Sequence, residues 1–315
     1  MRRRVAFLAG TLTFTVITGV LHYATDLSVA TFLLAGVSLA GLAWIVGMAT
    51  ESVGTRFGPA ATGVLQSTLG NLPELFVVLF ALHAGHTVVA QTSILGSLFA
   101  NGLLVLGLAI VAGARTSRDG EMRFNPRQPS DTVILLQLAV FIIVLLGLSD
   151  RLGDAASRHQ EEISVVGAIA LLLVYASWLS RYLRGGGSEA AALEDEAGQL
   201  PFVQAIALLA LAAVAAALVS DWFVTALGPA IDQLGISEAF TGLVIVAIAG
   251  NAVENVVGVT LAAKGKSDLA ISVITNSVSQ IAVFLFPALV LLSLFFADHL
   301  TFVVNPVYIL SLIHI

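Results

Sequence analysis

Long apolar stretches follow one another along almost the whole chain, separated by short polar segments. Each stretch is long enough to cross a bilayer as a helix, which takes about 17–25 residues. The pattern therefore predicts an all-α, polytopic membrane protein of about ten helices. The expected spans are residues 5–24, 28–49, 59–83, 88–112, 131–149, 161–182, 201–220, 239–263 and 268–297, and a tenth that begins near residue 302 and is cut off at Ile315.

The composition supports this class and excludes others. Of the 315 residues, 58% are hydrophobic and 11% are charged, whereas a soluble domain has about 45–50% apolar and about 25% charged residues. A net charge of −6 without a long basic run argues against a nucleic-acid partner, and the absence of cysteine excludes disulfides and thiolate metal sites. No nucleophile–base or metal–histidine constellation stands outside the polar linker, so we expect neither an enzyme nor a cofactor.

The positive charges predict the orientation. With a cytoplasmic N-terminus, 12 of the 14 Lys and Arg residues fall in inner segments, and only Arg151 and Arg158 fall outside. Short loops and the lack of a targeting extension favour a bacterial plasma membrane. The inner basic residues are Arg2, Arg3, Arg4, Arg56, Arg115, Arg118, Arg123, Arg127, Arg181, Arg184, Lys264 and Lys266.

One segment, residues 183–200, reads as a soluble insert. Three glycines at 185–187 are followed by the acidic run 194–196, a composition typical of a flexible linker. We therefore expect an N-terminal half over 1–182, an acidic cytoplasmic linker over 183–200 and a C-terminal half over 201–315.

Two acidic residues lie deep inside predicted spans, Glu74 and Glu254. A charge at mid-bilayer costs about 2.5–3.5 kcal/mol on insertion scales, so such a residue is a functional candidate. Both sit in the pattern G-N-x-x-E, at 70–74 and 250–254, and further identities follow at the same offset of 180 positions. By the charge count the first span runs outward and the second inward, which predicts two inverted-topology repeats and transport by alternating access.

The residues of the two motifs suggest a cation site. Gly, Asn and Pro73 weaken a helix, and a break at this depth would free backbone carbonyls at Gly70 and Gly250. Carboxylates, asparagine amides and carbonyls form an all-oxygen ligand set, which Ca²⁺ prefers, with six to eight oxygens in all. Since two carboxylates can be neutralised by one divalent ion or by two protons, exchange of Ca²⁺ for H⁺ follows from competition.

Longer signatures extend both motifs. The first continues through Ser93-x-x-Gly96-Ser97-x-x-x-Asn101, and the second through Lys264-x-Lys266-x-Asp268-Leu269 and Ser277-x-x-Gln280-Ile281. With them, residues from about the second span to 297 resemble the cation/proton exchanger family of the calcium/cation antiporter superfamily. The resemblance implies that the main Ca²⁺ ligands and proton acceptors are Glu74 and Glu254, assisted by Asn71 and Asn251, and that the residues lining the site or relaying protons are Ser97, Ser277, Gln280 and Asn101.

The chain departs from that family at Asn255, where the family usually has a histidine, and at Asn276, where it usually has a glycine. Pro73 is more similar to the sodium/calcium branch. Three alternatives therefore stay open: a Na⁺-coupled exchanger of the same fold, a passive cation channel with the carboxylates as a selectivity ring, and an inactive fragment, because the family has about eleven spans.

His83 and His86 flank the outer end of the Glu74 span. They could form a pH-sensitive vestibule, but we favour their interpretation as interfacial polar residues.

Overall fold

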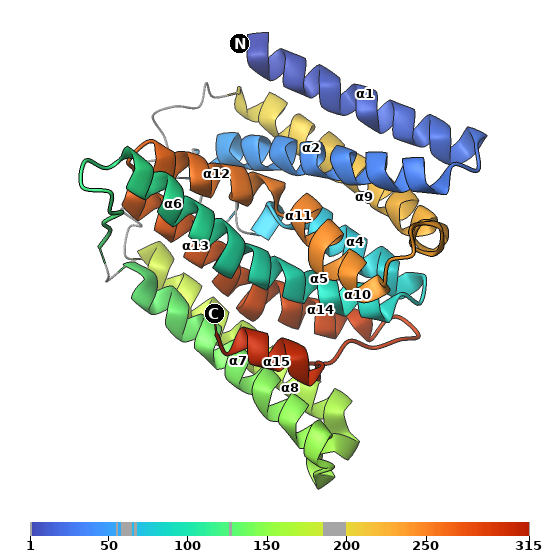
Figure 1. Ribbon diagram of the computed structural model, residues 1–315, viewed down its shortest axis with the longest axis vertical. Helices are drawn as coiled ribbons and strands as arrows, with labels where there is room; N and C mark the ends of the chain where they lie inside the picture. The colour runs from blue at the N-terminus through green and yellow to red at the C-terminus, as the bar shows by residue number, and fades with distance from the viewer. Residues whose placement is uncertain are drawn as a thin grey trace. The chain divides into compact units, whose positions relative to one another are not determined.

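The computed structural model describes residues 2–54, 56–57, 65, 68–125, 128–184 and 200–314, with residues 2–5, 128–131, 182–184 and 253–254 described by their backbone alone. Every regular element in these ranges is a helix (Figure 1). In chain order they are α1 (Arg2–Ala24), α2 (Ser28–Gly54), α4 (Leu72–His83), α5 (Thr87–Phe99), η1 (Ala100–Val105), α6 (Leu106–Thr116), α7 (Gln128–Leu152), η2 (Ala155–His159), α8 (Gln160–Arg184), α9 (Phe202–Leu234), α10 (Glu238–Phe240), η4 (Thr241–Val246), α11 (Ala247–Gly250), α12 (Ala252–Ala263), α13 (Ser267–Gln280), η5 (Ile281–Leu285), α14 (Phe286–Ser293) and α15 (Pro306–Leu312).

The helices form two compact units, and each unit combines two segments that are separate in the sequence. Unit 1 contains Met1–Ser93 and Tyr182–Val253, and unit 2 contains Ile94–Arg181 and Glu254–Ile315. The boundaries therefore fall inside α5 and α12 as well as at the end of α8. Residues 185–199 of the predicted linker lie outside the described residues, so the division into two halves stays a prediction.

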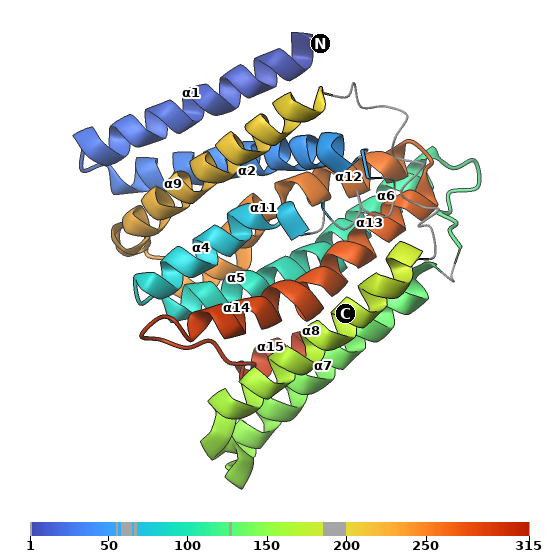
Figure 2. The ribbon, with the colours of Figure 1, turned by 180° about the vertical axis from the view of Figure 1, so that it is seen from behind.

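In unit 1, α2 and α9 pack along each other, α1 lies against both, and α4 packs on α9 (Figures 1 and 2). The stacked rings of Phe32 and Phe223, with centroids 4.6 Å apart, join α2 to α9. A Cβ on Gly41 would lie 2.6 Å from the hydroxyl oxygen of Thr11, so glycine permits the close approach of α1 and α2. Small residues serve this purpose widely in membrane helix packing.

In unit 2, α13 packs against α7, α6 and η1, and α7 also contacts η5 and α15. A buried cluster joins α6, α12 and α13. A Cβ on Gly258 of α12 would lie 2.9 Å from Cγ1 of Ile274 on α13, which shows how closely these two helices approach. The cluster consists of Val105, Ala109, Ala262, Ala270 and Ile274.

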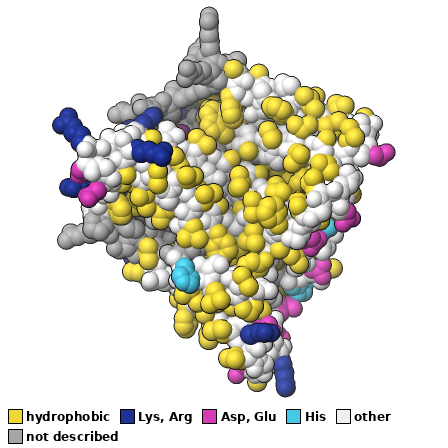
Figure 3. Space-filling view, viewed as in Figure 1, with side chains coloured by type: hydrophobic (Ala, Val, Ile, Leu, Met, Phe, Trp, Pro, Cys, Tyr) yellow, Lys and Arg dark blue, Asp and Glu magenta, His cyan; other side chains and the backbone are white. Residues whose placement is uncertain are grey.

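The predicted spans are confirmed in broad outline. Within the described residues, 7 helices are long and apolar enough to cross a membrane, or 8 if residues 238–250 and 255–263 count as one interrupted span. Two predicted spans end too early: the one predicted for 28–49 continues to Gly54, and the one predicted for 201–220 continues to Leu234 in a helix of 33 residues. The segment after residue 302, where a cut-off tenth span was expected, forms the short helix α15 of 7 residues. Hydrophobic side chains are spread across the middle of the surface in view, and charged side chains lie mainly near its edges (Figure 3), as expected for a surface that faces lipid.

The internal repeat extends to the secondary structure. When 180 is added to the residue numbers, the range of α4 equals that of α12, the range of α5 matches that of α13 to within one residue, and the first residue of α6 corresponds to the first residue of α14. Each copy has a turn with a left-handed glycine, Gly85 (φ 80°) and Gly265 (φ 74°). The flanking hydrogen bonds also correspond: His86 N donates to Ala81 O at 2.8 Å, and Lys266 N donates to Leu261 O at 3.0 Å.

Candidate ion-binding site

The predicted helix breaks are present at both motifs. Asn71 and Asn251 each stand between helical segments with nearly the same backbone angles, φ −85° and ψ 7° at Asn71 and φ −104° and ψ 21° at Asn251. Both lie in the sparsely populated region between the α and β wells, where functional residues are often found. Pro73 falls in the first turn of α4, where a missing N–H leaves no intrahelical bond unmade.

Glu74 is the third residue of α4, and its side chain is 1% exposed. The backbone N–H groups of a first helical turn point toward such a carboxylate, and the helix dipole favours its negative charge. Gly250, the last residue of α11, lies against it, because a Cβ there would be 3.5 Å from Cβ of Glu74. Within unit 1, the glycine of the second motif, Gly250, therefore packs directly against the glutamate of the first motif, Glu74.

The fully buried Asn251 has a fixed orientation. Its Nδ2 donates to the carbonyl oxygen of Ala247 at 3.0 Å, and its backbone N donates to the same oxygen at 3.2 Å. The carbonyl oxygen of Ala247, the first residue of α11, thus accepts two hydrogen bonds from Asn251, one from its backbone and one from its side chain. Asn71 is buried in the same unit, and Gly70 is buried beside it.

Glu254 occupies the third position of α12, as Glu74 does in α4, and both helices have 12 residues. Its side chain lies outside the described residues. Among the side chains that the structure does describe, no three His, Asp or Glu residues gather closely enough to hold a metal ion.

Unit 2 holds the other predicted site residues: Ser97 and Asn101 in the first copy, and Ser277 and Gln280 in the second. All four are buried, and Nδ2 of Asn101 donates to Oγ of Ser277 at 3.3 Å. The structure thus joins one residue of each copy through a hydrogen bond between positions 176 residues apart.

Two features of this region escaped the sequence prediction. First, π-helical turns lie at Ala100–Val105 and Ile281–Leu285, directly at Asn101 and after Gln280. Such turns are rare and frequent at functional sites. Second, α2 continues to Gly54 and contains the half-buried Glu51, although the predicted span ended at residue 49. The last turn of α2 was missed because the polar residues 50–52 were interpreted as the end of the span.

Comparison with known proteins places the chain in a family. The family model described as sodium/calcium exchanger protein matches residues 27–182 and 204–315. The Ca(2+)/H(+) antiporter ChaA of Bacillus subtilis is 31% identical over 266 residues, which cover 82% of this chain and 75% of that protein. Vacuolar cation/proton exchanger 3 of Oryza sativa subsp. japonica is 30% identical over 282 residues, 85% of this chain and 68% of that protein.

Solved structures agree. The structure of native YfkE matches 98% of this chain and 88% of its own, with a TM-score of 0.77 and 28% identity. The H+/Ca2+ exchanger CAX shares the fold, with a TM-score of 0.70 at 16% identity over 99% of this chain and 80% of its own. The chain therefore belongs to the sodium/calcium exchanger protein family and is an integral membrane protein similar to the family's cation/proton exchangers.

Proposed function

We propose that this protein is a secondary antiporter that exchanges Ca²⁺ for H⁺ by alternating access. Glu74 and Glu254 are the groups that bind either the cation or protons. The observation that carries the proposal is Glu74, a carboxylate that is 1% exposed in the first turn of a helix that starts at a break. Glu254 has the same backbone position in the second copy. Relatives named as Ca(2+)/H(+) antiporters support the choice of ions.

The chemistry rests on competition for the carboxylates. A buried carboxylate is costly unless it is neutralised, either by a bound cation or by a proton. When Ca²⁺ leaves, protons take its place, and when protons leave, Ca²⁺ rebinds. Asn71 and Asn251 supply amide oxygens next to the breaks, and Ser97, Asn101, Ser277 and Gln280 supply buried polar groups that line the path or relay protons.

The test is Ca²⁺ accumulation by proteoliposomes under an imposed pH gradient, in the wild type, Glu74→Gln and Glu254→Gln. Glutamine keeps the shape and removes the charge. We expect uphill accumulation by the wild type and none above protein-free vesicles in either variant. A matched control is Glu162→Gln, which changes an exposed glutamate at the start of α8 and should transport normally. Normal exchange by both Gln variants of the motifs would overturn the site.

The same assay separates the alternatives. The family description and the shared fold of the sodium-calcium exchanger NCX_Mj (TM-score 0.55, 20% identity, covering 91% of this chain and 87% of that one) favour Na⁺ coupling as the second candidate. Accumulation driven by a Na⁺ gradient at equal pH on both sides would identify it. A passive channel would give no uphill accumulation with either gradient.

A further inference from the structure

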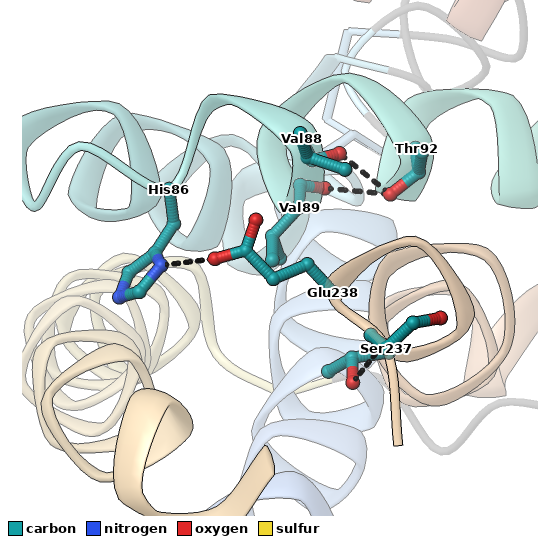
Figure 4. A network of polar contacts seen from close by, with 7 residues as sticks. His86, Val88, Val89, Thr92, Ser237 and Glu238 are labelled. Carbon is teal, nitrogen blue, oxygen red and sulfur yellow. Dashed lines mark hydrogen bonds and ion pairs between the residues drawn. The ribbon is translucent and has the colours of Figure 1, made fainter. Parts of the chain in front are cut away.

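A histidine and a glutamate far apart in sequence meet at one end of unit 1. Nδ1 of His86 lies 2.7 Å from Oε1 of Glu238, although 152 residues separate them (Figure 4). His86 follows the left-handed Gly85 at the start of α5, and Glu238 is the first residue of α10. The two side chains are 25% and 37% exposed, so the pair is reachable from water and still partly desolvated.

The surroundings define how the imidazole takes up a proton. An ionised carboxylate only accepts hydrogen bonds, so Nδ1–H donates to Glu238 and an added proton goes to Nε2. Nε2 lies beside Gly228 of α9, where a Cβ would be 3.9 Å away. The described elements around this corner also carry Asp26 before α2, His83 at the end of α4, and Asp221 and Asp232 on α9, besides Glu51 and Glu74 farther along α2 and α4.

Just beyond the pair, the same two segments touch at a point that only glycine allows. A Cβ on Gly242 of η4 would lie 2.0 Å from Oγ1 of Thr92 and 2.8 Å from the carbonyl oxygen of Val89. The hydroxyl of Thr92 is itself held by the carbonyl of Val88 at 2.7 Å (Figure 4). The segment α10–η4–α11 is thus pressed onto α5 next to the His86–Glu238 contact.

This segment leads to the candidate site. It runs as a continuous helix from Glu238 through η4 to Gly250. A Cβ on Gly250 would lie 3.5 Å from Cβ and 3.8 Å from Cγ of Glu74. A change in how firmly α10 is fastened to the start of α5 therefore acts on an element that ends at the ion-binding glutamate.

We propose that the His86–Glu238 pair is a proton-binding site separate from the motif glutamates, which sets how transport depends on the pH of the outer solution. This rests on the proposed exchange function and on the predicted orientation, which places residues 84–86 and 235–238 outside. Histidine is the side chain that changes charge between about pH 5 and 8. Protonation adds a positive charge beside the Glu238 carboxylate, so the hydrogen bond gains the Coulombic attraction of an ion pair. Acid outside tightens the contact and alkali loosens it.

The test compares the wild type with His86→Gln, Glu238→Gln and the double variant. Exchange is measured while the outer pH varies from about 5.5 to 8.5 and the inner pH is held constant. The wild type should show a component that changes roughly two- to fivefold, the size expected for a partly exposed ion pair. Each single variant and the double variant should lose that same component and keep exchange. His159→Gln, whose partner Glu162 is 3.6 Å away in an exposed contact, is the matched control and should keep the wild-type profile.

Variants with the wild-type outer-pH profile would overturn the inference while leaving the exchange function intact. Losses that add in the double variant would also overturn it, because the two residues would then act separately. If the wild type does not exchange, the proposed function fails, and a second measurement still tests the pair. Thermal unfolding of the four proteins in detergent should show a larger His86–Glu238 coupling at about pH 5.5 than at about pH 8.5, and equal coupling would contradict the proposal.

Discussion

The buried glutamate of α4 illustrates how neighbouring residues prepare a helix start for a carboxylate. Asn71 ends the preceding helical turn, Pro73 fits the first turn of the next helix, and Glu74 then stands where unpaired N–H groups and the helix dipole favour an anion. This position in the first turn is one where a helix favours a negative charge. The same sequence positions in the second copy place Glu254 in the same backbone setting.

The hydrogen bond between Asn101 and Ser277 gives a prediction for stability. It is buried and 3.3 Å long, and such bonds contribute about 0.5–1.5 kcal/mol net. Asn101→Ala and Ser277→Ala should each destabilise the protein in detergent, and the double variant should cost less than the sum of the two. Additive losses in denaturant unfolding would show that the two side chains do not act as a pair.

A second prediction concerns Asp119 in the loop between α6 and α7. The hydroxyl of Ser117 donates to its carboxylate, and with the backbone N–H of Glu121 and the charge of Arg123 this holds the pKa of Asp119 below its usual value. A depressed carboxyl pKa contributes stability above the usual value and loses it as the pH falls through the lowered one. Ser117→Ala should raise the pKa of Asp119, which an NMR titration of that carboxyl would detect. No change would mean that the serine is not the main cause.

At the scale of elements, the sequence predicted the helices well and their irregularities poorly. Hydropathy found the spans, and the shared G-N-x-x-E pattern found the breaks, because both depend on local composition. The π-helical turns at η1, η4 and η5 depend on packing against other helices, which no local pattern records. The length of α9 was missed because Asp221 reads as an end, whereas the neighbouring Trp222 and Phe223 are buried and the helix continues.

From the sequence, only those residues of the candidate site that occur in both copies of the repeat could be predicted. The glutamates, asparagines and serines stand in both copies and could be read from the chain. The contact between His86 and Glu238 could not, because the two residues belong to no common motif and lie 152 positions apart. The last turn of α2 was missed for a different reason, because the polar residues around Glu51 were taken as the end of the span.

The close contact of η4 with α5 predicts a steric effect. Gly242→Ala would place a methyl group within 2.8 Å of the Val89 carbonyl and closer still to Thr92. Overpacking of this kind typically costs about 1–3 kcal/mol, and here backbone must move. We expect a lower Tm and altered exchange. Gly107→Ala is the matched control, because nothing lies within 4 Å of a Cβ at that helical glycine. Equal Tm values for the two variants would contradict the packing described.

For the whole molecule, the distribution of charge predicts one orientation in the membrane. It follows from the excess of Lys and Arg in segments assigned to the inside. The chain has no cysteine, so single cysteines introduced into loops are the only thiols present. Asp154→Cys should react with a membrane-impermeant thiol reagent added to intact cells, and Arg118→Cys should react only after the membrane is opened. The reverse pattern would invert the topology and move the His86–Glu238 pair to the inner side.

The two copies of the glycine turn have a consequence for how the protein distinguishes one side of the membrane from the other. The backbone of the two turns does not distinguish the two sides of the membrane, because Gly85 and Gly265 make the same turn with the same hydrogen bonds. The copies differ in what the turn carries: His86 stands in one and Lys266 in the other, and the position that matches Glu238 in the first copy is Gly58, which has no side chain to offer a partner. Lysine keeps its charge throughout the physiological range, whereas histidine does not. Under the proposal made above for His86 and Glu238, a protein built from two similar copies would respond to the pH on one side of the membrane only, because of a few side chains rather than because of the fold.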